Sequence, residues 1–203
     1  MIAASTGNHG QSIAYAARLF NAAAIICAPA KANPVKVAAM EDLGAEVVLE
    51  GADFDDARRN AERLAAAGGQ RYIHSGDEPH LIAGVATHTL EILQEQPGIE
   101  VIIVPIGGGS GAAGACIAAK AINPRIQVIG VQSVEAQAAY LSWKTGRPTD
   151  SPNLTTTEGL STGSPFELPQ RILRQHLDDF VTVSDEAIEE ATRLMIEACC
   201  SAV

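Results

Sequence analysis

The sequence predicts an α/β fold with open parallel sheets, helices on both sheet faces and two lobes. Short runs of β-branched residues alternate with segments of helical periodicity, and glycine-rich turns follow two of the strand-like runs. Aromatic residues make up only 4% of the chain, whereas alanine, valine and isoleucine are abundant. Strands separated by helices in this way are typical of βαβ units, in which buried parallel strands are nearly continuous apolar runs.

The predicted strands are short apolar runs in which Ile and Val are concentrated. They are residues 1–4, 22–29, 45–51, 71–75, 101–106, 126–132 and 180–185. The predicted helices are segments with apolar residues at helical spacing. They are residues 10–20, 34–43, 55–67, 80–95, 112–121 and 186–198. Right-handed crossovers between parallel strands would place these helices on both faces of the sheets.

Capping residues support several of these boundaries. Asn33 precedes Pro34, which is the order expected of an N-cap and the first helical residue. Gly44 follows the same helix as a C-terminal glycine should. Residues 184–187, Ser-Asp-Glu-Ala, place acids in the first turn of the last helix. The Thr-, Ser-, Gly- and Pro-rich stretch 145–169 has no clear period, and we expect a surface excursion or an active-site border.

Composition restricts the class of protein. A formal net charge of −10, without any basic run, argues against a nucleic-acid partner. No apolar run reaches the roughly 18 residues of a membrane span, and no basic leader precedes the first strand. We therefore expect a soluble, cytoplasmic, metabolic protein. Cys27 and Cys116 lie in apolar runs and are predicted to be buried free thiols; Cys199 and Cys200 have no nearby metal-ligand pattern.

The first informative turn lies between the strand 1–4 and the following helix. It contains Ser5, Thr6, Gly7 and Asn8, followed by a histidine and a further glycine. Backbone N–H groups and the positive end of the helix dipole would point into this turn, which favours a carboxylate or a phosphate. The alternative interpretation, an ordinary N-cap with an adjacent turn, explains the separate residues but less readily the whole string.

The second informative turn follows the buried strand 101–106. It contains Gly107, Gly108, Gly109, Ser110 and Gly111 and opens the next helix. Four glycines in five positions would form a nest of N–H groups suited to one phosphate.

A dinucleotide fingerprint is the alternative for this turn, because Gly109, Gly111 and Gly114 match G-x-G-x-x-G. That motif requires an acid at the end of the next strand, where this chain has Gln132, and the nearest acid is Glu135. A lone phosphomonoester is therefore favoured. The two turns together suggest a phosphorylated cofactor next to a carboxylate-bearing substrate.

The string Ser-Thr-Gly-Asn-His-Gly-Gln at 5–11 resembles the substrate-carboxylate loop of fold-type II pyridoxal-phosphate enzymes, in the threonine dehydratase and serine racemase branch. The 107–111 loop is similar to the phosphate loop of that family, and further segments agree in order along the whole chain. They are NPVKVAAMEDLGAEVV, HSGDEPHLIAGVATHTLEI, NPRIQVIGVQ, TTTEGLS and VSDEAIEEA. The resemblance implies a two-lobed, tryptophan synthase β-like fold and β-elimination of a hydroxy amino acid to a 2-keto acid and ammonia.

The resemblance also implies residue roles with pyridoxal 5′-phosphate. Asn8 would bind the ring hydroxyl oxygen, the 107–111 loop the phosphate, and Glu158 and Gly159 would pass close to the ring. The residues implied around the substrate carboxylate are Ser5, Thr6, Gly7 and His9. A divalent cation in some relatives is bound at positions that here are Gln132 and Ala138, so no metal site is expected.

The family's Schiff-base lysine lies upstream of the first loop, and its contact to the pyridine nitrogen lies downstream of the last helix. The sequence contains no matching segment for either, so we expect a chain truncated at both ends and assign no catalytic residue. The four lysines do not match the family pattern and are predicted to lie on the surface. They are Lys31, Lys36, Lys120 and Lys144.

Two lobes are expected on the same basis: a small one at 6–86 and an incomplete large one from 1–5 and 87–203. Uncovered strand edges and an apolar face would then promote association, which favours a homo-oligomer, in the simplest case a dimer. Three functions remain open: a threonine or serine dehydratase-like lyase, a serine racemase-like isomerase, and a non-catalytic fragment or pseudoenzyme that binds a ligand or a partner chain.

Overall fold

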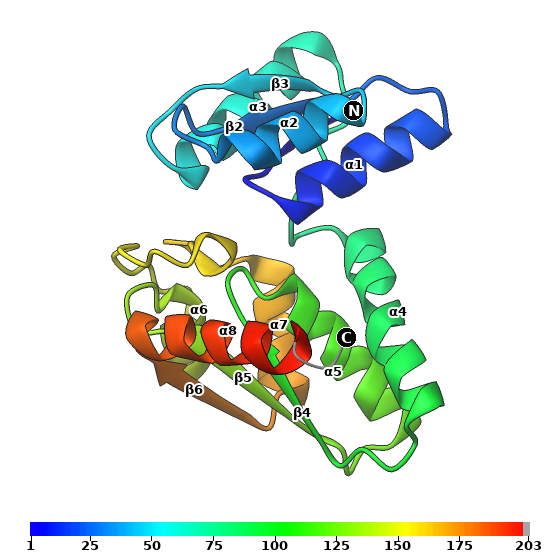
Figure 1. The fold of residues 1–203 in the computed structure, drawn as a ribbon, viewed down its shortest axis with the longest axis vertical. Coiled ribbons are helices and arrows are strands. Elements are labelled where there is room, and N and C mark those ends of the chain that lie inside the picture. Colours follow the sequence, from blue (N-terminus) through cyan, green and yellow to red (C-terminus); the bar gives the residue numbers. More distant parts are fainter. Residues whose placement is uncertain (201–203) are drawn as a thin grey trace. The chain divides into compact units, whose positions relative to one another are not determined.

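The chain forms two compact units, Met1–Glu78 and Pro79–Val203, each built around a three-stranded parallel sheet (Figure 1). The structure, a computed structural model, describes residues 1–200, and the side chains of residues 1–198. The strand orders are β1-β2-β3 and β4-β5-β6, so every strand pairs with its neighbour in the sequence. The predicted α/β class with parallel sheets is confirmed.

The first sheet carries helices on both faces. Its strands are β1 (Ile2–Ala4), β2 (Ile25–Ala28) and β3 (Glu46–Leu49), and its helices are α1 (Asn8–Leu19), α2 (Pro34–Asp42) and α3 (Phe54–Gly68). One core joins Ala3 and Ile26 to α1 and α2, while another joins Ile2 and Cys27 to α3. The side chains of each strand thus alternate between two cores, as the period of two requires.

The second unit contains the glycine-rich loop. Its strands are β4 (Val101–Pro105), β5 (Gln127–Ser133) and β6 (Asp179–Val183). Its helices are α4 (Pro79–Glu95), α5 (Ser110–Ile122), α6 (Ala138–Thr145), α7 (Glu167–His176) and α8 (Asp185–Cys200), with a 3-10 turn, η1 (Glu158–Leu160). The main core packs β4 and β5 against α5, α6 and α7 through residues such as Val104, Val128 and Leu173.

The opposite face of this sheet is largely open. In Figure 1, α8 lies over β5 and β6, and a groove of about 530 Å³ separates Val131 and Val183 from the apolar side of the helix. Farther along the same face, Val101 is 46% and Ile103 67% exposed. The open sheet face thus exposes several apolar side chains, and large apolar patches of this kind are uncommon on monomeric proteins.

Close contact between α4 and α5 depends on one glycine. A methyl group added to Gly114 would lie 2.8 Å from the backbone nitrogen of Ala86 and 3.0 Å from a side-chain carbon of Val85. The absence of a side chain at Gly114 therefore allows the two helices to approach each other. This contact, rather than a dinucleotide, explains the third glycine of the G-x-G-x-x-G match.

Several boundaries differ from the sequence prediction. Residues 71–75 form no strand; a single bridge joins Tyr72 to Ile2. The helices α6 and α7 were not predicted; the predicted irregular stretch 145–169 contains η1, and α7 begins at its end. The caps at Asn33 and Gly44 are confirmed: the Asn33 side chain accepts a hydrogen bond from the N–H of Val35, and Gly44 has φ +92°.

The two units also differ from the predicted lobes. Residues 1–5 lie in the first unit because β1 pairs with β2 in register, from Ile2 with Ile25 to Ala4 with Cys27. The boundary falls before Pro79 rather than after residue 86, because α4 is one continuous helix that packs on α5. Assignment of the units to the small and large lobes of the resembling enzymes stays a prediction.

The thiols of Cys27 and Cys116 are free and buried, as predicted. Burial raises the pKa of the Cys116 thiol to about 12, which keeps it protonated. The side chains of Cys199 and Cys200 lie outside the described residues. Among the helices of the described chain, none is both long enough and apolar enough to cross a membrane.

Candidate functional site

The first loop is organised by the hydroxyl of Ser5. This side chain is 4% exposed, and its oxygen accepts hydrogen bonds from the N–H of Gly7 (3.0 Å) and of Gly10 (2.9 Å). It therefore caps α1, which begins at Asn8 rather than near residue 10. Gly10 in turn packs closely on β2 and α2, since an added methyl group would lie 2.4 Å from the sulfur of Met40.

The capping by Ser5 leaves other donors free at the start of α1. Among residues 1–200, no group accepts a hydrogen bond from the backbone N–H of Thr6, Asn8 or His9. These N–H groups lie at the positive end of a helix of 12 residues. The loop is thus suited to an anion through its backbone donors.

The ring of His9 is turned into the first unit. Its Nε2 lies 3.3 Å from the carbonyl oxygen of Ile73, so this nitrogen carries the proton that is donated. Burial lowers the pKa of His9; the carbonyl of Ile73 opposes this effect, and the neighbouring His74 adds to it. The neutral ring is therefore favoured, and His9 would contact an anion through its backbone N–H rather than as a cation.

A lysine that the sequence assigned to the surface lies beside this loop. A methyl group built on Gly7 would lie 3.8 Å from Cδ and 4.0 Å from Nζ of Lys36 on α2. Lys36 is half-buried. Sequence spacing offered no signal for this proximity, because it depends on the packing of α2 against α1.

The second loop combines a short strand, a left-handed glycine and a helix start. Gly109 has φ +93° and precedes α5, a conformation that a residue with a side chain rarely adopts. Within residues 1–200, no group accepts a hydrogen bond from the six consecutive backbone N–H groups of residues 107–112, whereas the N–H of Ala113 bonds to the carbonyl of Gly109 (2.9 Å). All six residues are buried or half-buried. Burying a backbone N–H group without an acceptor costs free energy. A bound phosphate would supply acceptors for this set of donors.

Neighbouring segments leave no room for side chains in the first part of this loop. A methyl group on Gly108 would lie 2.0 Å from the ring of Phe166. One on Gly107 would lie 3.0 Å from Cα of Leu160 and 3.1 Å from the carbonyl oxygen of Gly159. In contrast, a methyl group on Gly111 would meet nothing within 4 Å. The loop is therefore packed on one side and open at the start of α5.

Gln132 occupies the position at which a dinucleotide site would need an acid, and here its side chain forms hydrogen bonds to the backbone. It is fully buried, and its amide donates to the carbonyl of Gly107 (3.4 Å) while its oxygen accepts from the N–H of Tyr140 (2.9 Å). The side chain thus connects the loop to α6. Over the described residues, no cluster of three or more His, Cys, Asp or Glu side chains is arranged to hold a metal ion.

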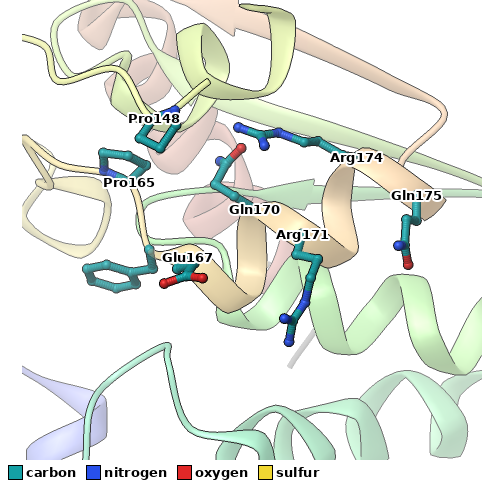
Figure 2. A pocket seen from close by; sticks show the side chains of 8 residues that line it. Pro148, Pro165, Glu167, Gln170, Arg171, Arg174 and Gln175 are labelled. Atoms are coloured by element: carbon teal, nitrogen blue, oxygen red, sulfur yellow. The ribbon is translucent and has the colours of Figure 1, made fainter. Parts of the chain in front are cut away.

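A cavity in the second unit lies along α7 and does not include any predicted site residue. It measures about 610 Å³. Figure 2 shows Gln170 and Arg174 on the side of α7 that faces Pro148, with Arg171 and Gln175 pointing to the other side. The Gln170 amide and the Arg174 guanidinium each donate to a carbonyl of α6 at 3.0 Å. These polar groups therefore fasten α7 to α6, and we assign no ligand to this cavity.

The structure groups the predicted site residues into two sets. Ser5, Thr6, Gly7, Asn8 and His9 lie in the first unit. The 107–111 loop lies in the second, where it contacts the η1 turn that contains Glu158 and Gly159. The ligand roles of all these residues stay predictions.

Comparisons with known proteins identify the family of the chain. The family model described as "Pyridoxal-phosphate dependent enzyme" matches residues 1–202. An L-threonine ammonia-lyase of Thermotoga maritima is 36% identical over 198 residues, which are 97% of this chain and 49% of that protein. The chain spans about half the length of the curated relatives that it matches first.

Solved structures of pyridoxal-phosphate enzymes have the same fold as this chain. The processed form of threonine deaminase isoform 2 from Solanum lycopersicum superposes with a TM-score of 0.90 at 31% identity, over 97% of this chain and 58% of that one. Maize serine racemase superposes with a TM-score of 0.90 at 31% identity, over 97% and 60%. The fold is therefore that of the fold-type II neighbours, and the chain belongs to the family of pyridoxal-phosphate dependent enzymes.

Proposed function

We propose that this protein acts in the β-elimination of a small hydroxy amino acid, threonine or serine, to a 2-keto acid and ammonia. The observation that carries the proposal is the row of six backbone N–H groups at residues 107–112 without an acceptor among the described residues. Their place at the start of α5 suits the phosphate of pyridoxal 5′-phosphate. Relatives named as threonine ammonia-lyases support the choice of reaction.

The second unit would hold the cofactor. Residues 107–111 would bind its phosphate, and Gly159 and Glu158 would border the ring; the resemblance assigns the ring hydroxyl to Asn8. When bound, the cofactor supplies an electron sink for negative charge at the substrate α-carbon. The chain contributes fixed dipoles that need no reorganisation, because the N–H groups are already oriented by the glycine-rich backbone.

The first unit would hold the substrate carboxylate. Within the described part of the chain, the N–H groups of Thr6, Asn8 and His9 have no acceptor and could donate, and the Thr6 hydroxyl adds a further donor. Ser5 and Gly7 would shape this loop, since the Ser5 oxygen is already engaged by two backbone N–H groups. In a chain with a net charge of −10, these local donors would offset the long-range repulsion of an anionic substrate.

A serine racemase-like isomerase is the second candidate, and the likeness to maize serine racemase favours it. Both reactions would use the same two loops. Assays of pyruvate, 2-oxobutyrate and D-serine after incubation with L-serine or L-threonine distinguish the lyase from the isomerase.

A non-catalytic role that binds a ligand or a partner chain is the third candidate. The candidate depends on whether a lysine of this chain can react with the cofactor. Two of the lysines already have partners: Lys120 donates to Asp178 and to the carbonyl of Ile126, both at 2.6 Å, and Lys144 donates to the hydroxyl of Tyr140 (3.1 Å). Borohydride reduction after addition of pyridoxal phosphate, followed by peptide mass mapping, tests this candidate. One lysine labelled in full supports catalysis by this chain, whereas scattered or absent labelling together with tight binding of the cofactor supports the non-catalytic role.

We further propose that the protein associates with a second copy of itself. The open face of the second sheet, with Val101 and Ile103, and the exposed Met195 of α8 would be covered in such an assembly. Sedimentation at several concentrations tests this point, and a monomer at all micromolar concentrations contradicts it. The cytoplasmic location stays a prediction.

Direct binding is the test of the proposed function. Titration of the chain with pyridoxal phosphate, followed by absorbance and by ³¹P NMR of the bound phosphate, is expected to show one saturable site. Inorganic phosphate is expected to compete. Absence of saturable binding, or binding that phosphate does not affect, would refute the role of the 107–111 loop.

A further inference from the structure

Asp185 is a buried carboxylate that none of the proposed roles uses. It is the first residue of α8 and is 9% exposed. Its Oδ1 accepts hydrogen bonds from the hydroxyls of Ser133 (2.5 Å) and Thr155 (2.9 Å), and its Oδ2 from the N–H of Thr156 (2.8 Å). Thr155 also reaches Oδ2 at 2.9 Å.

No lysine or arginine among the described side chains forms an ion pair with this carboxylate. Its charge is stabilised by hydrogen bonds alone. The hydroxyl of Ser133 and the N–H of Thr156 hold the pKa of Asp185 below its usual value, so the group is ionised at neutral pH. A buried charge is tolerated only when its hydrogen bonds are satisfied, which makes this site sensitive to its geometry.

The hydrogen bonds of Asp185 determine where the segment 155–160 lies. Thr155 continues the network by accepting from the N–H of Thr157 (3.1 Å), and Thr157 accepts from the N–H of Leu160 (2.9 Å). This last bond closes the η1 turn. The same turn packs on the glycine-rich loop, where a methyl group on Gly107 would lie 3.0 Å from Cα of Leu160. A continuous set of contacts therefore leads from Asp185 to the predicted phosphate loop.

We propose that Asp185 is a positioning residue for the cofactor site: it holds the segment 155–160 against the 107–111 loop and fixes the backbone that borders the cofactor ring. This inference rests on the proposed function for the identity of the ligand. Asp185 itself touches no predicted ligand group; it acts through Thr155 and Thr156.

A carboxylate suits this task better than an amide. Both oxygens of Asp185 accept bonds, and the donors come from β5 and from the segment 155–160. In Asp185→Asn, one of the two positions becomes an NH₂ group. It would face the N–H of Thr156, which cannot accept, or the hydroxyl of Ser133, which accepts from the N–H of Glu135 (3.0 Å) and could accept again only by giving up the bond that it now donates to Oδ1. One bond of the network is thus lost or reversed in either orientation, and the negative charge that strengthens the others is removed.

The test compares four single variants in the full chain. Asp185→Asn and Thr155→Val break the network, whereas Thr155→Ser keeps the hydroxyl. Glu186→Gln is the matched control, because it removes an acid from the same first turn of α8 on an exposed side chain. The control separates the network from a general effect of acids on the helix dipole.

Two readouts are needed. Without cofactor, amide hydrogen exchange of peptides covering 154–162 is expected to be at least about tenfold faster in Asp185→Asn and Thr155→Val, and unchanged in Thr155→Ser and Glu186→Gln. With pyridoxal phosphate, the first two variants are expected to bind about tenfold more weakly and to shift the absorbance maximum of the bound cofactor. The double variant should be no worse than either single one, because both remove the same connection.

The outcomes separate the two proposals. Unchanged exchange in Asp185→Asn overturns the anchoring of 155–160. Faster exchange with unchanged cofactor affinity and spectrum overturns the positioning role and leaves a purely structural one. A wild-type chain that binds no pyridoxal phosphate refutes the proposed function and with it the positioning of a cofactor, while the exchange data still show whether Asp185 anchors the segment.

Discussion

The substitution Gly111→Ala should weaken cofactor binding at the predicted phosphate loop without destabilising the fold. Gly111 is the second residue of α5, and a methyl group there would meet no atom within 4 Å. The substitution therefore causes no clash in the protein. Because alanine loses less backbone freedom on folding, the free energy of unfolding should rise by about 0.4–1 kcal/mol. Because Cβ atoms of a helix tilt toward its N-terminus, we expect the methyl group to lie on the side of the free N–H groups.

The expected loss of binding follows from those N–H groups. A hydrogen bond to a charged group contributes about 1.5–3 kcal/mol. Displacement of the phosphate from one or two donors should therefore raise the Kd for pyridoxal phosphate by at least about tenfold. Equilibrium dialysis gives the Kd, and thermal unfolding without cofactor gives the stability. A higher Kd with equal or higher stability is the expected result.

Gly84→Ala is the matched control. Gly84 lies within α4, and a methyl group there would also meet no atom within 4 Å. The control should gain a similar stability without a change in Kd. Wild-type affinity in Gly111→Ala would show that the phosphate does not lie at the start of α5, and an equal loss in both variants would show that the effect is not local.

Three further predictions concern stability. Ser5→Ala should lower the free energy of unfolding by about 1–2 kcal/mol in urea titrations, because two backbone N–H groups lose their acceptor; an unchanged midpoint would show that Ser5 is not the cap. Gly114→Ala should cost about 1–3 kcal/mol, the opposite sign to Gly84→Ala, since the added methyl group meets the backbone of Ala86 at 2.8 Å; a stabilised variant would contradict the close helix contact. Partial burial alone would raise the pKa of Asp178, yet hydrogen bonds from Lys120 and from the N–H of Val128 lower it. The carboxylate therefore stabilises the fold above its unfolded pKa near 3.8, and this stability is lost as the pH falls through the lower folded pKa. Asp178→Asn should remove this loss below pH 4, as seen by unfolding at several pH values, and an unaltered pH dependence would refute the assignment.

The fold was predictable where local signals and tertiary packing agree. Alternating apolar runs predicted six of the strands because each strand is buried in a parallel sheet, and the caps at Asn33 and Gly44 fixed helix ends locally. The run 71–75 failed because a strand needs a partner along its length, and here only Tyr72 pairs with Ile2. Helix α7 was missed entirely, because Pro165 and Pro169 interrupt the pattern of an amphipathic segment.

The parts of the candidate site that are formed by backbone groups could be predicted from the sequence. Glycine spacing encodes the 107–111 loop directly, since the conformation at Gly109 and the contacts of Gly107 and Gly108 exclude side chains. Lys36 and Asp185 gave no such signal. Lys36 comes to lie beside the first loop through the packing of α2, and Asp185 reaches the segment that packs on the second loop through hydrogen bonds between residues 29 to 52 apart in sequence.

In both loops the polar side chains form hydrogen bonds within the protein, so that backbone N–H groups are left to bind a ligand. The Ser5 oxygen is occupied by two N–H groups of its own loop, and the His9 ring is turned to the Ile73 carbonyl. In the second unit, Gln132 holds the Gly107 carbonyl, and Asp185 holds the segment that packs on Gly107. Side chains therefore set the shape of each loop, and the backbone supplies the donors. It follows that substitutions of Ser5, Gln132 or Asp185 should change affinity through loop geometry, whereas a methyl group at Gly111 should change it by direct obstruction with the fold intact.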